Sequence, residues 1–394
     1  MIVPSGGFIA MNSFGQKICL SMIVKDEVHV IHRCLDSVRS MIDHWVIVDT
    51  GSTDGTQQAI RTALADIPGT LVERPWVDFA FNRNEALALA RPHAPYSLII
   101  DADDQLVIPD GFVMPKLTEA GYMLTILDGH TKYWRVQLIN NKFKWRYRGV
   151  VHEFLECSGN PDTPTLLLAM RRGVDGGRHR DDMSEHRDLA AMEKALAVET
   201  DPVMIARYTF YLARSYRDIG EDRKALDLYL KRADLGYWEE EIYVSLLNAG
   251  RLMEQLDEPE HNVLQLYDRA IPICPARAEA RHGAIQYCNR RRNFAAGYRY
   301  GEGGTSPKMP SEGIAIIPWI YTYGLREEFS INAYHMGEYR ACLSTCFEIL
   351  GESDIPEDVL TRTADLARKA LLKMVDPVWG SRQPSYSAEF LPAW

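Results

Sequence analysis

Ser97-Leu-Ile-Ile-Asp-Ala-Asp-Asp104 is the stretch on which the interpretation of this chain depends. A short apolar run, preceded by Tyr96, ends abruptly in the acidic residues Asp101, Asp103 and Asp104. Apolar runs of this length are typical of buried strands in a mostly parallel sheet. The carboxyl ends of such strands are where α/β sheets bind their ligands, so this stretch predicts one wall of a site.

The spacing of the acidic residues suggests a cation site. Asp101 and Asp103 share one face of an ideal strand, while Asp104 points to the other face. Two carboxylates on one face repel each other unless a cation lies between them. Carboxylate oxygens suit Mg²⁺ or Mn²⁺, and these ions commonly also bind substrate phosphates. The alternative is a strand that ends in a polar turn, because Asp-x-Asp alone is a weak signal.

The segments before this stretch alternate between strand and helix. Three more strand-like runs lie at residues 17–24, 45–49 and 70–73. Segments with apolar residues at helical spacing separate them, at residues 30–42, 57–65 and 82–91. This alternation predicts a parallel sheet covered by helices with right-handed crossovers. The glycine motifs of dinucleotide-binding folds and P-loops are missing from the sequence, which counts against both alternatives.

The pattern changes after Gly121. Further strand-like segments lie at residues 122–126, 134–139, 143–147 and 166–170. The second and third of these predict an antiparallel hairpin that turns at Asn140-Asn141. His152-Glu153 is interpreted either as a metal ligand beside a proton acceptor or as a partly exposed strand end. Gly173-Val-Asp-Gly-Gly-Arg-His-Arg180 is either a cationic loop that closes on a phosphate or an exposed interdomain linker.

From Ser184 the sequence is almost wholly helical in pattern. Pairs of helices that alternate large and small residues, as tetratricopeptide repeats do, are predicted at residues 205–235, 243–270, 277–300 and 333–350. Such pairs stack, because none can bury its apolar face alone. The predicted organisation is an irregular tail, an α/β domain, an all-α repeat domain and a second irregular tail, at residues 1–16, 17–182, 183–377 and 378–394.

Composition indicates an ordinary multidomain globular protein. The chain has 394 residues, of which 46% are hydrophobic and 25% charged, and these are too many residues for one ordinary core. A net charge of −10 argues against general nucleic-acid binding. No apolar stretch approaches membrane-spanning length. Seven scattered cysteines without a Cys-x-x-Cys pair predict a reduced, cytoplasmic chain.

Four motifs occur in order: Ser21-Met-Ile-Val-Lys-Asp-Glu27, Val46-Ile-Val-Asp-Thr-Gly-Ser-Thr-Asp-Gly-Thr56, Phe81-Asn-Arg-Asn-Glu-Ala-Leu87 and Leu98-Ile-Ile-Asp-Ala-Asp-Asp104. Together they resemble the family 2 glycosyltransferases with a GT-A fold, over residues 17–155. The helical half resembles family members that carry appended tetratricopeptide repeats. The resemblance implies an inverting, metal-dependent transfer of a sugar from a nucleotide diphosphate donor, with a UDP-sugar expected. The acceptor stays open between a glycan, a lipid-linked saccharide, a peptide and a protein.

The resemblance also implies roles for individual residues. The donor is expected to bind at Val24, Lys25, Glu27, Asp49, Arg83, Asp101 and Arg178. Mn²⁺ or Mg²⁺ is expected at Asp103, Asp101 and His152. The Glu-Asp pair that usually supplies the inverting base is not evident, so Glu153 is the candidate base and Asp128 the reserve.

Two other functions compete with an active transferase. The chain could be a repeat-based scaffold for protein partners whose sugar-transferase domain is inactive, or a nucleotidyltransferase on a similar sheet. Retention of Asp49, Arg83, Asp101 and Asp103 favours an active glycosyltransferase. For the repeats themselves, a groove that presents an acceptor competes with a surface for dimerisation or a protein partner.

Overall fold

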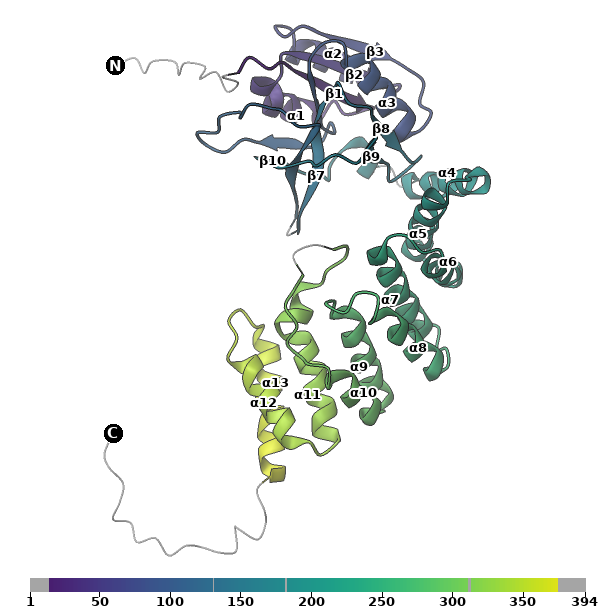
Figure 1. Cartoon of the computed structure of the whole chain (residues 1–394), viewed down its shortest axis with the longest axis vertical. Coiled ribbons are helices and arrows are strands. Elements are labelled where there is room, and N and C mark those ends of the chain that lie inside the picture. The colour runs from purple at the N-terminus through teal and green to yellow at the C-terminus, as the bar shows by residue number, and fades with distance from the viewer. Residues whose placement is uncertain (1–13, 130, 181–182, 311–312, 375–394) are drawn as a thin grey trace, which may run out of the picture. The chain divides into compact units, whose positions relative to one another are not determined.

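The computed structural model describes residues 14–129, 131–180, 183–310 and 313–374 (Figure 1). The chain forms two compact units, Met1–Val198 and Glu199–Trp394. The first unit is α/β and the second is all helical, which confirms the predicted fold class. Helix α4 (Ser184–Val198) falls in the first unit. Apart from residues 14–16, the predicted tails at 1–16 and 378–394 lie outside the described residues.

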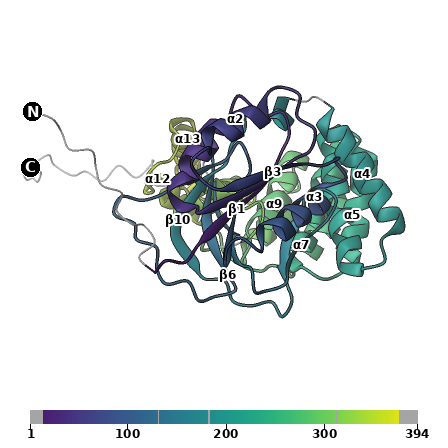
Figure 2. The same ribbon diagram turned by 90° about the horizontal axis from the view of Figure 1, so that it is seen from above.

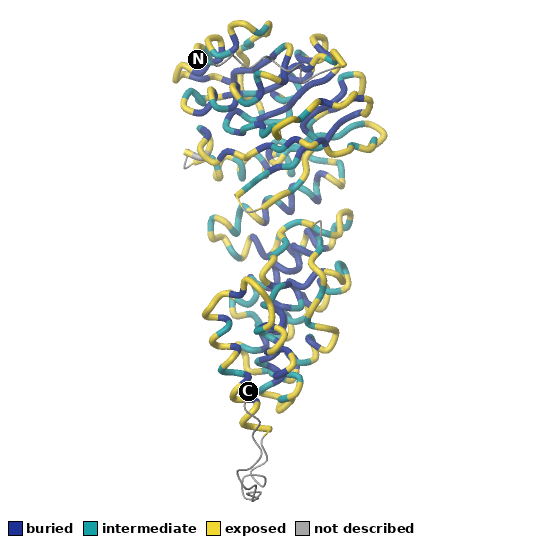
Figure 3. The backbone as a smooth tube through the Cα atoms, turned by 90° about the vertical axis from the view of Figure 1, so that its left-hand side faces the viewer, coloured by how far each residue is buried: buried dark blue, intermediate teal, exposed yellow. Residues whose placement is uncertain are grey.

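An eight-stranded mixed sheet forms the centre of the first unit, in the order β3-β2-β1-β4-β7-β6-β10-β5. The four strands predicted from the alternation, β1 to β4, run parallel to one another. Strands β1, β2 and β4 are buried along nearly their whole length, whereas β3 is exposed or half-buried, and Figure 3 colours buried backbone dark blue. The bounds are β1 Ile18–Val24, β2 His44–Asp49, β3 Gly69–Glu73, β4 Tyr96–Ile99, β5 Gln105–Val107, β6 Gly121–Asp128, β7 Thr131–Asn140 and β10 Thr165–Arg171.

The helices between these strands cover both faces of the sheet. Helix α1 (Ile31–Val38) packs beside α2 (Thr56–Ala63), and Figure 2 shows α2 and α3 (Phe79–Ala90) on opposite faces. Right-handed crossovers require this arrangement, because the chain moves from β1 through β2 to β3 and then returns to β4 on the far side of β1. The loops that follow β1, β2 and β4 therefore meet at one edge of the sheet.

The predicted hairpin between residues 134–139 and 143–147 is wrong. Strand β8 (Trp145–Arg148) pairs with β9 (Phe154–Cys157) in a separate two-stranded sheet. The reason is that β7 already pairs with β4 along one edge and with β6 along the other, so no edge remains for β8. This small sheet places the loop that carries His152 and Glu153.

The second unit is a stack of antiparallel helices in which each helix packs on the next. Its elements are α5 Pro202–Asp218, α6 Asp222–Asp234, α7 Glu239–Gln255, α8 Glu260–Ala270, α9 Glu279–Arg291, α10 Phe294–Gly301, the π-helical turn η3 Ile320–Gly324, α11 Leu325–His335, α12 Tyr339–Leu350 and α13 Glu357–Met374. The pair predicted at residues 333–350 begins earlier than expected, at η3. No helix within the described ranges has both the length and the apolar content to cross a bilayer.

A buried charge network ties the segment before η3 to the start of α9. The Glu279 carboxylate, fully buried, accepts hydrogen bonds from Arg277 Nε at 2.9 Å, from the Tyr321 hydroxyl at 2.9 Å and from the Ile317 backbone N–H at 3.1 Å. Arg277 also donates to the carbonyl of Ile314 at 3.1 Å. The network therefore fixes a segment that has no regular structure of its own.

We predict that Glu279→Ala destabilises the helical unit by at least about 1–3 kcal/mol, because three buried donors, Arg277 Nε, the Tyr321 hydroxyl and the Ile317 N–H, lose their acceptor, while Arg277 keeps its ion pair with Glu240. Differential scanning calorimetry of the whole chain measures the effect as a lower unfolding temperature for one transition. The exposed Glu302→Ala serves as the control and is expected to change stability by less than about 0.5 kcal/mol. Equal unfolding temperatures for the two variants would contradict the role of the network.

Candidate functional site

Two loops at the carboxyl edge of the sheet are bound to each other. The Asp26 backbone N–H donates to Ser52 Oγ at 2.8 Å, and the Glu27 N–H donates to Thr56 Oγ1 at 2.8 Å. In return, Asp26 Oδ1 accepts from the Thr53 N–H at 2.8 Å. The hydroxyl-rich loop after β2 therefore serves to hold the loop after β1, in addition to starting helix α2.

Asp49, the last residue of β2, has one carboxylate oxygen satisfied and one not. Its side chain is 0% exposed, and its Oδ1 accepts from the backbone N–H groups of Gly51 at 2.9 Å and Ser52 at 2.8 Å. Its Oδ2 is buried without a hydrogen-bond partner among the described residues. A buried acceptor without a partner is costly, so Oδ2 stands out as a polar atom whose hydrogen bonding the described residues leave unmet.

The acidic cluster after β4 is a turn rather than a continuation of the strand. β4 ends at Ile99, and the Asp104 N–H donates to the Asp101 carbonyl at 3.1 Å. The ideal-strand assignment of faces is therefore wrong here. Asp104 is 3% exposed and accepts from the Gly173 N–H at 2.9 Å, while burial and the nearby Asp101 and Asp103 charges raise its pKa to about 7. Asp104 is therefore a buried residue that stabilises the turn through its hydrogen bond with Gly173.

Arg83 joins two of the predicted site residues. It lies on α3 with its side chain 11% exposed, and it donates from Nε to Glu153 Oε1 at 2.7 Å and from Nη2 to Asp101 Oδ1 at 2.6 Å. The guanidinium also lies 5.4 Å from the centre of the Tyr147 ring. Burial opposes the charge on Asp101, but Arg83 and Arg135 outweigh it and hold the pKa of that carboxyl below its usual range.

The two asparagines on either side of Arg83 have structural roles. Asn84 accepts from the Tyr147 N–H at 2.7 Å and donates to the Tyr147 carbonyl at 2.9 Å, which fastens α3 to β8. Asn82 is fully buried and accepts from the Val77 N–H at 3.0 Å. The hydrogen bonds of Asn82 and Asn84 thus fix the part of α3 that carries Arg83.

The glycine-rich segment 173–177 packs onto the acidic turn, so the linker interpretation is wrong for it. A Cβ on Gly173 would lie 2.2 Å from the Asp103 carbonyl oxygen, and one on Gly176 would lie 2.7 Å from Asp103 Oδ2. The Gly177 N–H donates to both carboxylate oxygens of Glu27 at 3.0 Å. Only glycine permits so close an approach, and the segment therefore forms part of the site around Asp103.

Sequence reasoning missed the ion pair that secures this segment. Arg33 on α1 donates to both carboxylate oxygens of Asp175, at 2.8 and 2.7 Å, and to the Asp103 carbonyl at 2.9 Å. Arg33 and Asp175 are 142 residues apart in sequence, and no local motif links them. In the sequence, the glycines at positions 173 and 176 indicated that another part of the chain packs closely against this segment.

Three further residues were predicted to bind the nucleotide-sugar: Val24, Lys25 and Arg178. The Val24 carbonyl accepts from the Thr50 N–H at 2.9 Å, and Lys25 is exposed beside it. Arg178 pairs with Asp188 of α4 and lies over the Phe79 ring, 4.6 Å from its centre. Asp128, the reserve base, accepts from Arg172 Nη1 at 2.7 Å at the end of β6.

The predicted trio of metal ligands is not brought together. Within residues 14–129, 131–180, 183–310 and 313–374, no three His, Cys, Asp or Glu side chains gather in a way that could hold a metal ion. His152 is exposed, with a backbone φ of +52° in the tight β8–β9 loop. An ion such as Mg²⁺ needs only one or two protein carboxylates and fills its other positions with phosphate oxygens and water, so a site without a trio of ligands is chemically consistent with such an ion.

Comparison with known proteins agrees with the four motifs. The family described as Glycosyl transferase family 2 matches residues 19–109, which confirms the family predicted for this part of the chain. A TPR repeat-containing protein from Synechococcus elongatus is 38% identical over 93 residues, which are 23% of this chain and 22% of that relative. The chain thus spans about a fifth of the length of that curated relative.

Solved structures give weaker likenesses. YrrB, described as a TPR protein with an unusual peptide-binding site, is 14% identical and covers 48% of this chain and 84% of its own, with a TM-score of 0.34. Residues 1–349 of S. aureus TarS are 12% identical and cover 70% of this chain and 92% of their own, with a TM-score of 0.30.

The contact between Glu27 and Gly177 gives a prediction about pH. The pKa of Glu27 is raised from an ordinary value of 4.5 to about 7, mainly by burial and also by the neighbouring Asp103, against the opposing effect of the Gly177 N–H. The folded state therefore holds this proton more tightly than the unfolded state. It follows that the free energy of unfolding falls as pH rises from about 4.5 to about 7.

We predict that Glu27→Gln removes this decline, because the amide oxygen can still accept from Gly177 but does not ionise. Relative to wild type, the variant should gain stability on the order of 1–3 kcal/mol between pH 5 and pH 8. Denaturant unfolding at several pH values measures it, with the exposed Glu302→Gln as control. Parallel pH profiles for wild type and Glu27→Gln would show that Glu27 keeps its ordinary pKa.

Proposed function

We propose that this chain, which carries a glycosyl transferase family 2 domain, moves a sugar from a nucleotide diphosphate donor to an acceptor, with a divalent ion and with inversion at the anomeric carbon. The observation that carries the proposal is the edge formed by Asp49, Asp103 and the Arg83 ion pairs. There a buried acceptor without a partner and a half-buried carboxylate follow strands of the main sheet, and Arg83 pairs with a candidate base from the loop between β8 and β9.

Asp49 is proposed to hold the nucleotide base. Its Oδ2 is an acceptor without a partner among the described residues, and a uracil ring offers N3–H as a matching donor. Because Oδ1 is already fixed by Gly51 and Ser52, the carboxylate cannot turn away without losing two hydrogen bonds. This pairing favours a UDP-sugar as the donor.

Asp103, assisted by Asp101, is proposed to bind the donor diphosphate through Mn²⁺ or Mg²⁺. Such an ion offsets the negative charge that develops on the leaving diphosphate. Arg83 holds Asp101 in place from one side, and the segment 173–177 packs against Asp103 from another. Glu27 anchors that segment through Gly177, which is the role we assign to this residue of the first motif.

Glu153 is proposed to take the proton from the acceptor hydroxyl or thiol. Its side chain is largely buried, and Arg83 uses only its Oε1 among the contacts of the described residues. Oε2 is then the oxygen that receives the proton, while Arg83 holds the orientation. A carboxylate on the far side of the sugar from the diphosphate would invert the anomeric centre.

The acceptor and the cellular setting are part of the proposal. The helical unit is proposed to bind an acceptor, whether glycan, lipid-linked saccharide, peptide or protein, or to form a homodimer. All seven cysteines, each within the described residues, are free, which supports a reduced cytoplasmic location.

A scaffold without transferase activity is the second candidate. The similarity to a protein described as TPR repeat-containing is consistent with it. The ion pair between Glu153 and Arg83 also favours it, because the pair already engages one oxygen of the carboxylate that would have to act as the base. Hydrolysis of a UDP-sugar in the presence of Mn²⁺ separates the candidates, since release of free UDP requires an active site.

We predict that Asp103→Ala abolishes metal-dependent sugar transfer while the chain stays folded, because the diphosphate loses the carboxylate that holds its ion. Release of nucleoside diphosphate from a panel of nucleotide-sugars measures turnover, and circular dichroism checks the fold. The exposed Asp110→Ala is the matched control and should keep full activity. Full turnover by a folded Asp103→Ala protein would remove Asp103 from the mechanism.

We predict that Glu153→Gln lowers turnover by ~10²–10⁴-fold with little change in donor affinity, because the amide still accepts from Arg83 but cannot take a proton. Steady-state kinetics and calorimetric donor titration measure the two quantities separately. Asp128→Asn, made in parallel, should retain turnover. If Asp128→Asn is the inactive variant and Glu153→Gln is not, the reserve assignment of the base is the right one.

A further inference from the structure

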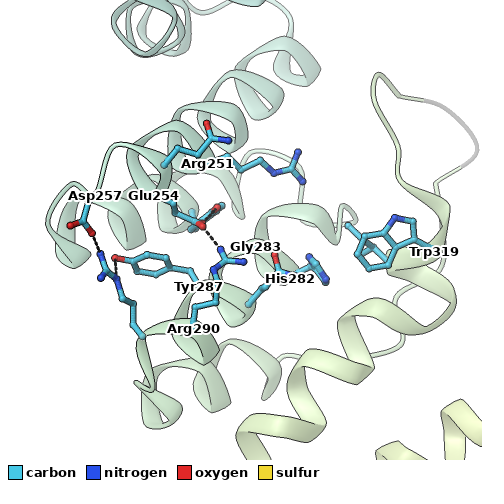
Figure 4. Close-up of a pocket in the computed structure, with 13 residues that line it drawn as sticks. Arg251, Glu254, Asp257, His282, Gly283, Tyr287, Arg290 and Trp319 are labelled. Carbon is cyan, nitrogen blue, oxygen red and sulfur yellow. Dashed lines mark hydrogen bonds and ion pairs between the residues drawn. The ribbon is translucent and has the colours of Figure 1, made fainter. Parts of the chain in front are cut away.

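A cavity of about 660 Å³ lies wholly within the helical unit (Figure 4). Its walls come from α7, α9, the side chain of Tyr267 on α8 and the segment that leads into η3. Every residue that lines it belongs to the second unit, so it is a separate site from the edge of the sheet described above. Its size is typical of a pocket for a small ligand or for a few side chains of a peptide.

Three arginines line this pocket, and two of them have an ion-pair partner. Arg290 pairs with Glu254, and Arg291 pairs with Asp257 (Figure 4). Arg251, on α7, forms no ion pair or hydrogen bond with any residue in the described part of the chain. The three guanidinium groups therefore carry one positive charge more than the two carboxylates beside them, and Arg251, which acts on Glu254 without touching it, is the one without a direct pair among the described residues.

Helix α9, which carries Arg290 and Arg291, also presents a buried ring nitrogen without a partner. His282 is 4% exposed, and its Nε2 makes no hydrogen bond within the described residues. Burial, followed by the nearby charges of Arg251 and Arg290, lowers the pKa of His282 to about 4, so the imidazole is neutral at physiological pH. Trp319, 42% exposed, meets this ring edge to face at 5.0 Å between centres.

The wall that presents Trp319 is held rigidly. A Cβ on Gly324 would lie 2.3 Å from the Trp319 ring, so the indole rests directly on the backbone of the π-helical turn η3. The segment just before Trp319 is fixed by the Glu279 network, to which Ile317 donates. π-helical turns are frequent at functional sites, and this one sets an exposed indole beside the pocket.

We propose that this pocket binds a carboxylate whose neighbouring group is a flat apolar ring, with Arg251 pairing the carboxylate and Trp319 contacting the ring. His282 Nε2 supplies a neutral hydrogen-bonding position next to both. The carboxylate belongs either to an acidic residue of a polypeptide or to a free small acid. This binding is independent of sugar transfer and does not rest on the proposed function.

The charges favour a carboxylate over a phosphate. The planar fork of a guanidinium matches the two oxygens of a carboxylate, and the excess of one positive charge in the lining balances one negative charge. A phosphate dianion would bring a second negative charge close to Glu254 and Asp257, whose own partners are already engaged. The ligand is therefore expected to carry a single negative charge at this point.

Isothermal titration of the whole chain with three probes tests the proposal. The probes are indole-3-acetate, its neutral amide indole-3-acetamide, and an end-blocked peptide with Trp beside Asp. Binding of the free acid, of the peptide or of both, at least tenfold tighter than of the amide, supports the proposal and tells the two carboxylate sources apart. No saturable binding of either carboxylate at millimolar concentration, or equal binding of the amide, overturns it.

Substitution of the arginine locates the binding. Arg251→Gln should weaken the carboxylate at least tenfold, as expected for loss of a charged hydrogen bond. Arg340→Gln, an exposed α12 position, removes the same charge elsewhere in the unit and should leave affinity unchanged. Unfolding temperatures verify that both variants are folded. Equal affinities for the two folded variants would show that the carboxylate does not bind at Arg251.

Discussion

The candidate site depends on one buried guanidinium. Arg83 comes from α3, Asp101 from the turn after β4, and Glu153 from the loop between β8 and β9, and the two ion pairs of Arg83 hold all three together. A buried charge of this kind is stable only while its partners are present. The arrangement of α3, the main sheet and the two-stranded sheet is therefore constrained by one side chain, which the hydrogen bonds of Asn84 to Tyr147 support from the same helix.

Unpartnered polar groups mark a possible ligand position in each unit. In the first unit one of these groups is an acceptor, Oδ2 of Asp49, which calls for a donor such as a base N–H. In the second unit two of them, the Arg251 cation and Nε2 of His282, line one pocket and call for an anion and a neutral polar group. Folding leaves few such groups unsatisfied, so their chemistry indicates the kind of ligand more directly than the shape of a pocket does.

The sequence predicted what depends on local pattern and missed what depends on contacts between distant segments. Apolar runs and helical spacing were enough for β1 to β4 and for the stacked helices, since each is determined by its own residues. The pairing of β8 could not be predicted, because it follows from both edges of β7 being occupied. The same holds for Arg33 and Asp175, whose bidentate pair secures the segment 173–177 against Asp103. For Asp49 and Arg83, the motifs identified the residues, while only the structure showed which of their atoms are engaged.

The central claim is that Asp49 Oδ2 accepts an N–H of the donor's base, and calorimetric titration of UDP with Mn²⁺ tests it most directly. In Asp49→Asn the amide oxygen can keep the hydrogen bonds from Gly51 and Ser52, but the amide N–H₂ then faces the base N–H and cannot accept from it. We expect UDP to bind this variant at least about tenfold more weakly than wild type, while the exposed Asp110→Asn binds normally. Equal UDP affinity for wild type and a folded Asp49→Asn protein would contradict the account.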